Sequence, residues 1–150
     1  MRSGFSQAHS LEAICDFFNT IIKVPRPINL NLSELGSTNA YYLEQQHSIS
    51  ISYEIIAYFF QFFARETPED VAENTAGAFI FVTFHELGHC LIHELDLPAT
   101  GREEDAVDEF ATLLLIDFGP QGEQAIMAAA LWFASNPQSQ LPFYDEHSMD

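Results

Sequence analysis

Basic residues are scarce in this sequence of 150 residues. Lys and Arg together number 5, against 22 Asp and Glu, which gives a formal net charge of −17. A surface of this charge repels phosphate backbones and anionic headgroups, so neither nucleic acid nor a lipid surface is an expected partner. The charge would tolerate a cationic peptide or a metal ion, but its simplest role is to keep a chain with 14 Phe soluble.

Cysteine is also rare. Cys15 and Cys90 are too few for the disulfide framework of a small secreted domain. Cys90 directly follows His89, but neighbours on a helix point about 100° apart. We therefore expect Cys90 to pack in the core and not to act together with His89.

Long apolar segments are absent. The first ten residues contain no apolar stretch of the kind that opens a secretory signal. The longest nearly continuous apolar run, 76–84, is far shorter than the roughly 20 residues of a membrane span. We expect a soluble protein without stable membrane insertion, located in the cytoplasm, or secreted if a leader preceded this sequence.

Apolar residues as a class are nevertheless abundant. They make up 47% of the chain, enough for one hydrophobic core, and the length is too small for two domains of ordinary size. We predict a single domain over residues 1–150, with a core of about 10–135 and a loosely ordered tail at 137–150. No internal repeat or low-complexity linker divides the sequence.

Three segments predict β-strands. Polar and apolar residues alternate in 28–33 and 48–52, which is the period of half-buried strands. A turn at 36–39 and a short strand at 40–44 lie between them. Because the connections are so short, we expect the three strands to form an antiparallel sheet.

The remaining segments predict helices. Segment 53–65 is apolar nearly all round, as in a buried helix, and Thr67 followed by Pro68 is a typical helix start. Gly77 could interrupt the helix that begins there. The expected fold class is α+β, a small three-stranded sheet packed on a helical bundle. The other helical patterns cover 11–22, 67–95, 102–118 and 123–134.

The chemistry-bearing segment lies within the longest helical pattern. The sequence HELGH (85–89) has the form HExxH, in which both His project from one face of a helix. The two imidazoles can bind one Zn²⁺ at about 2.0–2.1 Å, and Glu86 can act on a metal-bound water as general base. Two polar His on an ordinary buried helix are the alternative. Burying His85, His89 and Glu86 without a metal would be costly, so we favour zinc.

A catalytic zinc takes three protein ligands and one water. In the metzincin pattern the third ligand would be a His at position 95, where this chain has Leu95. His93 is one turn beyond His89 but about 80° around the helix from His85. We expect His93 to lie at the helix end or beside the ligands, in a structural role.

The acidic run 103–109 supplies the candidates for the third ligand. Carboxylates at a helix start suit the helix dipole, which explains Glu103 and Asp105. Glu104 and Asp108 share a helix face, and the apolar residues around them indicate that this face packs inward. Our order is Glu104, then Glu103, with Asp105 or Asp108 a distant third. As an alternative to ligation, Asp108 would accept the free N–H of a ligand His.

This pattern resembles known zinc peptidases. HExxH followed by Glu104 and, four residues later, Asp108 is similar to the gluzincin arrangement, in which the Glu binds zinc and the Asp orients a ligand His. The stretch EEDAVDEFATLLL also resembles the ImmA/IrrE-type peptidases. From Pro25 to Leu115 the chain resembles a bacterial family of putative metallopeptidases, a domain of unknown function, most specifically through GREEDA (101–106).

One departure from that family bears on location. Its members commonly have Cys before the Gly of the turn and before the Tyr-Glu of the following helix, where this chain has Leu35 and Ser52. A disulfide that would suit a secreted protein is therefore missing. This departure favours the cytoplasm.

The residues predict metal-assisted peptide hydrolysis. Zn²⁺ would acidify its bound water and polarise the scissile carbonyl, and Glu86 would take the water proton and pass it to the leaving amine. The oxyanion needs a further stabiliser, for which the candidates are Tyr41, Tyr42, Arg102 and His147. An exposed sheet edge beside the zinc helix could hold an extended peptide by strand addition.

Three functions fit this pattern. The first is a zinc metallopeptidase with a broad range of peptide substrates. The second is a regulatory peptidase with one specific protein substrate, as the resemblance to ImmA/IrrE suggests. The third is an inactive zinc-binding interaction domain, which Glu86 argues against, because a structural zinc needs no general base. We expect a peptide or a protein as the partner.

Overall fold

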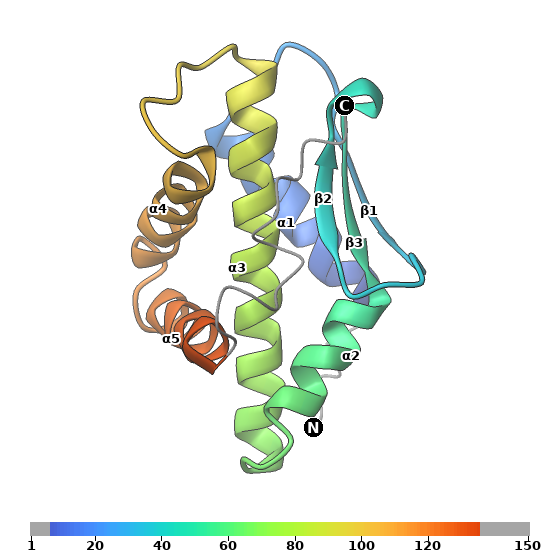
Figure 1. The fold of residues 1–150 in the computed structure, drawn as a ribbon, viewed down its shortest axis with the longest axis vertical. Coiled ribbons are helices and arrows are strands. Elements are labelled where there is room, and N and C mark those ends of the chain that lie inside the picture. Colours follow the sequence, from blue (N-terminus) through green and yellow to red (C-terminus); the bar gives the residue numbers. More distant parts are fainter. Residues whose placement is uncertain (1–6, 136–150) are drawn as a thin grey trace.

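The computed structural model describes residues 7–135, and the predicted loose tail and the candidate His147 lie outside this range. Within it the α+β class is confirmed. The long helix α3 runs through the middle, with α4 and α5 along one side and the sheet and α2 along the other (Figure 1). The elements are α1 (Gln7–Ile21), β1 (Asn29–Ser33), β2 (Ala40–Leu43), the 3₁₀ helix η1 (Glu44–Gln46), β3 (Ser48–Ser52), α2 (Tyr53–Phe62), α3 (Pro68–Glu94), α4 (Glu103–Ile116) and α5 (Pro120–Ser135).

The sheet is mixed, which corrects our expectation of an antiparallel sheet. β3 lies in the middle of the order β1–β3–β2, and it pairs antiparallel with β2 but parallel with β1. Short connections led us to expect that neighbours in sequence pair. Instead, the segment 34–39 carries the chain past the position that β3 fills. The strand bounds themselves lie within one residue of the prediction.

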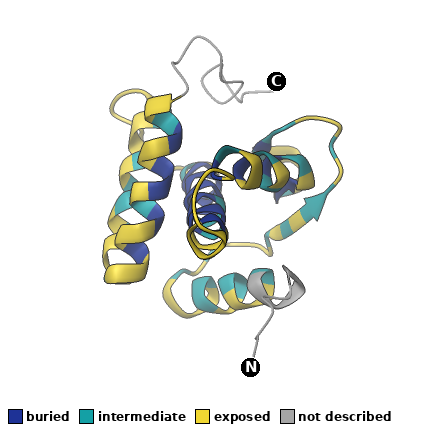
Figure 2. Cartoon of the chain, turned by 90° about the horizontal axis from the view of Figure 1, so that it is seen from below, coloured by how far each residue is buried: buried dark blue, intermediate teal, exposed yellow. Residues whose placement is uncertain are grey.

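The apolar core lies between the sheet, α2, α3 and α5. Ile51 of β3 is fully buried, and Phe59 of α2 meets Trp132 of α5 edge-on, with 5.0 Å between the ring centroids. Cys90 is fully buried too, which confirms its predicted place. Large side chains contribute about 1.5–3 kcal/mol each when buried. Figure 2 shows the buried faces of the helices turned toward the interior.

Helix α2 is less buried than its composition suggested. Ile55 and Phe59 face the core, but Phe60 is 57% exposed. The expectation of a well-buried helix was therefore wrong, since Ile55 and Phe59 are its only fully buried residues. The apolar residues of α2 extend beyond the one face that the sheet and α3 cover, and single exposed apolar side chains are common at protein surfaces.

Helix α3 begins where the sequence indicated. The hydroxyl of Thr67 accepts a hydrogen bond from the backbone N–H of Asp70 at 3.3 Å, and Pro68 takes the first helical position. Gly77 does not break the helix. It lets α5 approach, since a Cβ there would lie 2.9 Å from Cα of Ala125.

The burial of α3 bears on the question of a membrane. By length and composition alone, α3 could cross one, but 83% of its most apolar 18-residue window is buried inside the fold. Residues 81–91 are buried without interruption. Such burial is typical of a core helix in a soluble protein.

Candidate metal centre

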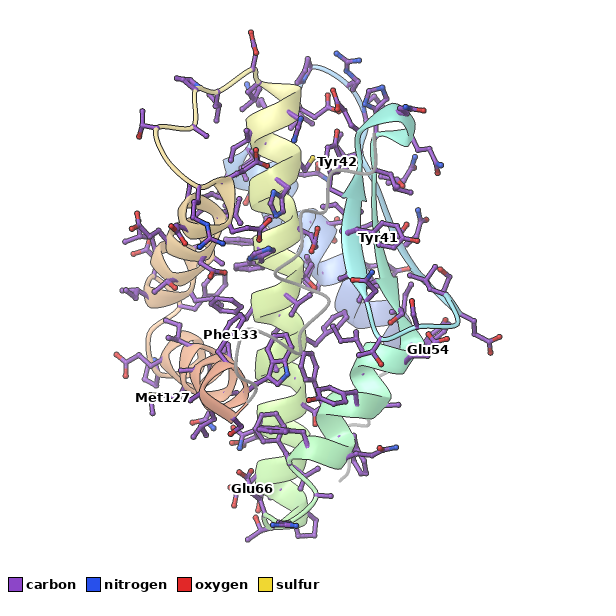
Figure 3. All side chains as sticks on the ribbon, in the orientation of Figure 1. Tyr41, Tyr42, Glu54, Glu66, Met127 and Phe133 are labelled. Carbon is purple, nitrogen blue, oxygen red and sulfur yellow. The ribbon has the colours of Figure 1, made fainter. Side chains whose placement is uncertain are left out.

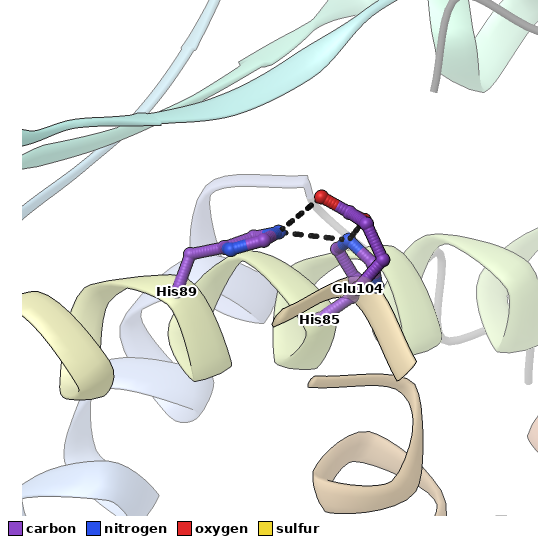
Figure 4. A group of neighbouring side chains, drawn as sticks. All are labelled: His85, His89 and Glu104. Carbon is purple, nitrogen blue, oxygen red and sulfur yellow. Dashed lines mark hydrogen bonds and ion pairs between the residues drawn. The ribbon is translucent and has the colours of Figure 1, made fainter. Parts of the chain in front are cut away.

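Two residues of the HELGH segment and one of the acidic run converge between α3 and α4. His85 and His89 project from one face of α3, and Glu104 reaches them from the first turn of α4 (Figure 4). Nε2 of His85 lies 3.2 Å from Nε2 of His89 and 3.2 Å from Oε2 of Glu104. Nε2 of His89 lies 3.4 Å from Oε1 of Glu104. The fold thus brings together the three residues that the sequence suggested as ligands.

The three side chains lie close enough together to bind one metal ion. Ligand atoms about 2.0–2.1 Å from a tetrahedral ion lie roughly 3.3–3.4 Å from one another. The two Nε2 atoms lie 3.2 Å apart, and each lies 3.2 or 3.4 Å from a different oxygen of Glu104. With one ligand atom taken from each residue, all three atoms lie within 4.8 Å of one another. Imidazole nitrogens and a carboxylate oxygen are ligands that several divalent metals accept. The three side chains could therefore hold one ion and leave a fourth position open.

Gly88 makes this convergence possible. A Cβ on this residue would lie 2.7 Å from Cβ of Val107, closer than real Cβ atoms come to one another. Because residue 88 has no side chain, α4 packs directly against the turn of α3 between the two histidines. Val107 is fully buried there, and Glu104, one turn earlier on the same face, reaches the histidines.

Each histidine contacts a second carboxylate of α4 through its other ring nitrogen. Nδ1 of His85 lies 2.8 Å from Oδ1 of Asp108, and Nδ1 of His89 lies 2.6 Å from Oε1 of Glu103. Such contacts fix the ring so that Nε2 faces the centre. Asp108 lies where we expected it. Glu103, our second candidate for the third ligand, lies on the outer side of His89, and Asp105 is exposed.

We did not foresee the position of Glu103, although the sequence contains a signal for it. Adjacent residues on a helix point about 100° apart, so Glu103 and Glu104 cannot approach one ion in the same way. If Glu104 faces the centre, its neighbour is placed to reach the outer nitrogen of a histidine. His93 lies beside this pair, with its Nε2 3.4 Å from Oε1 of Glu103.

Glu86 lies next to the three predicted ligands and is completely buried. Neither carboxylate oxygen has a hydrogen bond of ordinary geometry among the described residues. Burial raises the pKa of Glu86, and the imidazoles of His85 and His89 and the backbone of Tyr42 offset only part of this rise. A buried carboxylate without a donor is costly. A water bound to a metal ion would supply the missing donor.

A comparison with protein families agrees with this geometry. The family model described as "Putative metallopeptidase" (DUF4344) matches residues 1–150. The chain belongs to this family. The match extends beyond residues 25–115, which carried the resemblance in the sequence, and membership implies a hydrolase that uses a metal ion. No curated protein and no solved structure matches the chain, and the likeness to ImmA/IrrE-type peptidases stays a prediction.

The centre pairs opposite charges. Burial lowers the pKa of His85, but hydrogen bonds with Asp108 and Glu104 outweigh it and raise the pKa to about 10. The pKa of His89 rises for the same reason, because Glu104 and Glu103 outweigh its burial. Burial raises the pKa of Glu104, yet the two histidines hold it well below its usual range. The carboxylates thus favour positive charge at the centre.

Three further candidate residues lie outside the group of predicted ligands. Tyr41 and Tyr42 are consecutive on β2 (Figure 3), so their side chains point to opposite faces of the sheet. The hydroxyl of Tyr42 donates a 2.6 Å hydrogen bond to Oε1 of Glu94 at the end of α3. Tyr41 is half-buried, and Arg102 is exposed just before α4. The sequence had not indicated that the hydroxyl of Tyr42 would be engaged by Glu94.

Proposed function

We propose that this protein is a zinc-dependent peptidase that hydrolyses peptide bonds with a metal-activated water. The observation that carries the proposal is the convergence of His85, His89 and Glu104 beside the buried carboxylate of Glu86. Two His and one Glu are a ligand set of catalytic zinc, which keeps an open position for water. A structural zinc site would have four protein ligands and no use for Glu86.

The surrounding side chains have distinct roles in this proposal. When bound, zinc acidifies water and polarises a carbonyl. Glu86 takes the proton from the water and passes it to the leaving amine, and burial raises its pKa, which makes it a stronger base than an exposed carboxylate. Asp108 and Glu103 hold the Nδ1 side of the two histidines, so that both Nε2 atoms face the centre.

Strand β2 supports a peptide as the substrate. It is an outer strand of the sheet and packs against α3. The backbone hydrogen bond from Ser52 N–H to the carbonyl of Asn39 sets the alternation along β2. The backbone groups of Ala40 and Tyr42 consequently face away from β3. Both residues are buried, and the N–H of Ala40 donates to Oδ1 of Asn39 at 3.0 Å. An extended peptide that adds to this edge as a further strand, next to α3, would replace the contacts that now bury these groups.

Zinc content and cleavage of a peptide library test the proposal in three proteins: wild type, Glu86→Gln and Glu104→Ala. We expect Glu86→Gln to retain zinc and lose cleavage, and Glu104→Ala to lose zinc. Glu109→Ala is the matched control, because Glu109 is an exposed acid on the same helix. Undiminished zinc affinity in Glu104→Ala would remove the ligand assignment. A wild type that binds zinc and cleaves no library peptide would support a single protein substrate or an inactive interaction domain.

A further inference from the structure

A second buried carboxylate lies at the C-terminal end of α3. The side chain of Glu94, the last residue of α3, is only 3% exposed. It accepts hydrogen bonds or ion pairs from Tyr42 at 2.6 Å, from Nδ1 of His47 at 2.6 Å and from Nε of Arg26 at 2.9 Å. These partners come from three separate segments. Arg26 precedes β1, Tyr42 lies on β2, and His47 precedes β3.

The contacts of Glu94 also order the end of the sheet. His47 has a left-handed backbone (φ 48°), and its carbonyl accepts a hydrogen bond from the N–H of Asn29 at 3.0 Å. Nε2 of His47 lies 3.4 Å from a guanidinium nitrogen of Arg26. The pKa of Glu94 is lowered although burial raises it, because Tyr42, His47 and Arg26 together outweigh the burial. The carboxylate of Glu94 thus links α3 to the start of β1, the middle of β2 and the start of β3.

Stability alone is a weak reason for such an arrangement. A buried ion pair often adds little to the free energy of unfolding compared with well-packed apolar residues. Charge-assisted hydrogen bonds are, however, strongly directional. The distinctive effect of Glu94 is therefore to hold its partners in one relative position.

Tyr42 connects this carboxylate with the metal centre. Its backbone lies close enough to Glu86 to lower the pKa of that carboxyl, and its hydroxyl reaches Glu94. Glu86 and Glu94 are eight residues apart on one helix, about 12 Å along its axis. A single residue of β2 is therefore fixed to α3 at the helix end, and its backbone passes near the carboxyl group beside the centre.

We propose that Glu94 is a positioning residue. It fixes the position of β2 along the axis of α3, and so aligns the peptide-binding edge with the metal centre. This inference rests on the proposed function. It assigns to Glu94 no contact with substrate or metal. Its loss should therefore weaken peptide binding and leave zinc affinity unchanged.

Hydrogen exchange measured by mass spectrometry tests the positioning without any substrate. In Glu94→Gln we expect the amides of residues 40–43 to exchange several-fold faster, while the central strand β3 is unchanged. Tyr42→Phe removes one oxygen and should show a smaller effect in the same direction, even if Glu94→Gln fails to fold. Glu66→Gln is the matched control, because Glu66 accepts a hydrogen bond from Asn74 at the opposite end of α3.

Measurements of peptide binding test whether Glu94 aligns β2 for the substrate. In the Glu86→Gln background, which prevents turnover, the Kd is measured for the library peptide that the wild type cleaves fastest. Adding Glu94→Gln should weaken binding on the order of tenfold, with unchanged zinc affinity in a chelator competition. In the cleaving enzyme the same change should raise KM more than it lowers kcat.

Two outcomes separate this inference from the proposed function. Unchanged exchange at 40–43 together with unchanged peptide binding, in a folded Glu94→Gln protein, would overturn the positioning role. If the wild type neither binds nor cleaves any peptide, the proposed function fails. The exchange rates of Glu94→Gln and Tyr42→Phe then still decide whether Glu94 sets the position of β2.

Discussion

Helix α3 meets its two helical neighbours on one side through glycines, but the chemistry around the two glycines differs. At Gly77 a Cβ would lie 2.9 Å from Cα of Ala125 in α5, and at Gly88 it would lie 2.7 Å from Cβ of Val107 in α4. Around the first glycine the close neighbours are the buried Ala125 and Ala128. Around the second they include two histidines held by carboxylates of α4.

The two interfaces differ in how they affect the stability of the fold. The α3–α5 interface removes apolar surface from water, which directly stabilises the fold. The α3–α4 interface buries imidazoles and a carboxylate, which costs free energy unless each group is paired. A protein that needed only stability would pack both neighbours as it packs α5. The polar interface is instead suited to holding a cation.

The largest predicted effect is that of Glu86→Gln, a change beside the polar α3–α4 interface. Loss of the general base is expected to lower kcat on the order of 10²–10⁴-fold, while zinc content stays at the wild-type level. The metal-free variant should unfold at a temperature no lower than the wild type, since a neutral amide replaces an unpaired buried carboxylate. Glu123→Gln, an exposed change on α5, should alter none of these quantities. Cleavage within tenfold of wild type would remove Glu86 from the mechanism.

The outer carboxylates of α4 should affect the metal and leave the core intact. Asp108→Asn and Glu103→Gln are each expected to weaken zinc binding about 10–100-fold, because each histidine loses the partner that orients it. Competition with a chelator of known affinity measures the effect. Asp105→Asn is the matched control, since Asp105 is exposed on the same helix turn. Equal zinc affinity in all three variants would contradict an orienting role.

Alanine at the two glycines compares the interfaces directly. Gly77→Ala and Gly88→Ala should each lower the free energy of unfolding by about 1–3 kcal/mol, because the new methyl group overlaps a neighbouring helix. Only Gly88→Ala should also weaken zinc binding, since α4 carries Glu104. Denaturant titration and chelator competition provide the two measurements. Equal zinc affinity in both variants would show that the approach of α4 is not needed for the metal.

A further expected effect is a pH dependence of the metal-free protein. The pKa of His85 is raised to about 10 in the fold, from about 6.5 in an unfolded chain. Protonated His85 therefore stabilises the fold fully below about pH 6.5, and this contribution is lost as pH rises through about 10. The free energy of unfolding should fall over that range, and Asp108→Asn should reduce the slope. Identical slopes in both proteins would assign the loss to other groups.

Local spacing explains why so much of the centre was predictable. Residues four apart on a helix share a face, which holds for His85 and His89 and for Glu104 and Asp108. The bounds of β1 and β3 followed from alternation over five or six residues, and the start of α3 followed from Thr67 and Pro68. Each of these inferences depends only on neighbours in the chain.

Features that depend on distant segments were missed. The parallel pairing of β1 with β3 arises because β3 takes the central position. The contact of Glu103 with His89 depends on the angle at which α4 crosses α3. The cluster around Glu94 joins residues 26, 42, 47 and 94, and no periodicity relates them.

The sequence by itself determined which side chains share a helix face, and hence that two histidines and two carboxylates could form a metal centre. Only the tertiary structure decided which carboxylate faces the centre, which one contacts Nδ1 of each histidine, and which strand lies beside α3. The physical reason is that helical and strand periodicity are properties of the local backbone. Packing, by contrast, depends on where a glycine lets two distant elements approach and on which buried charges find partners.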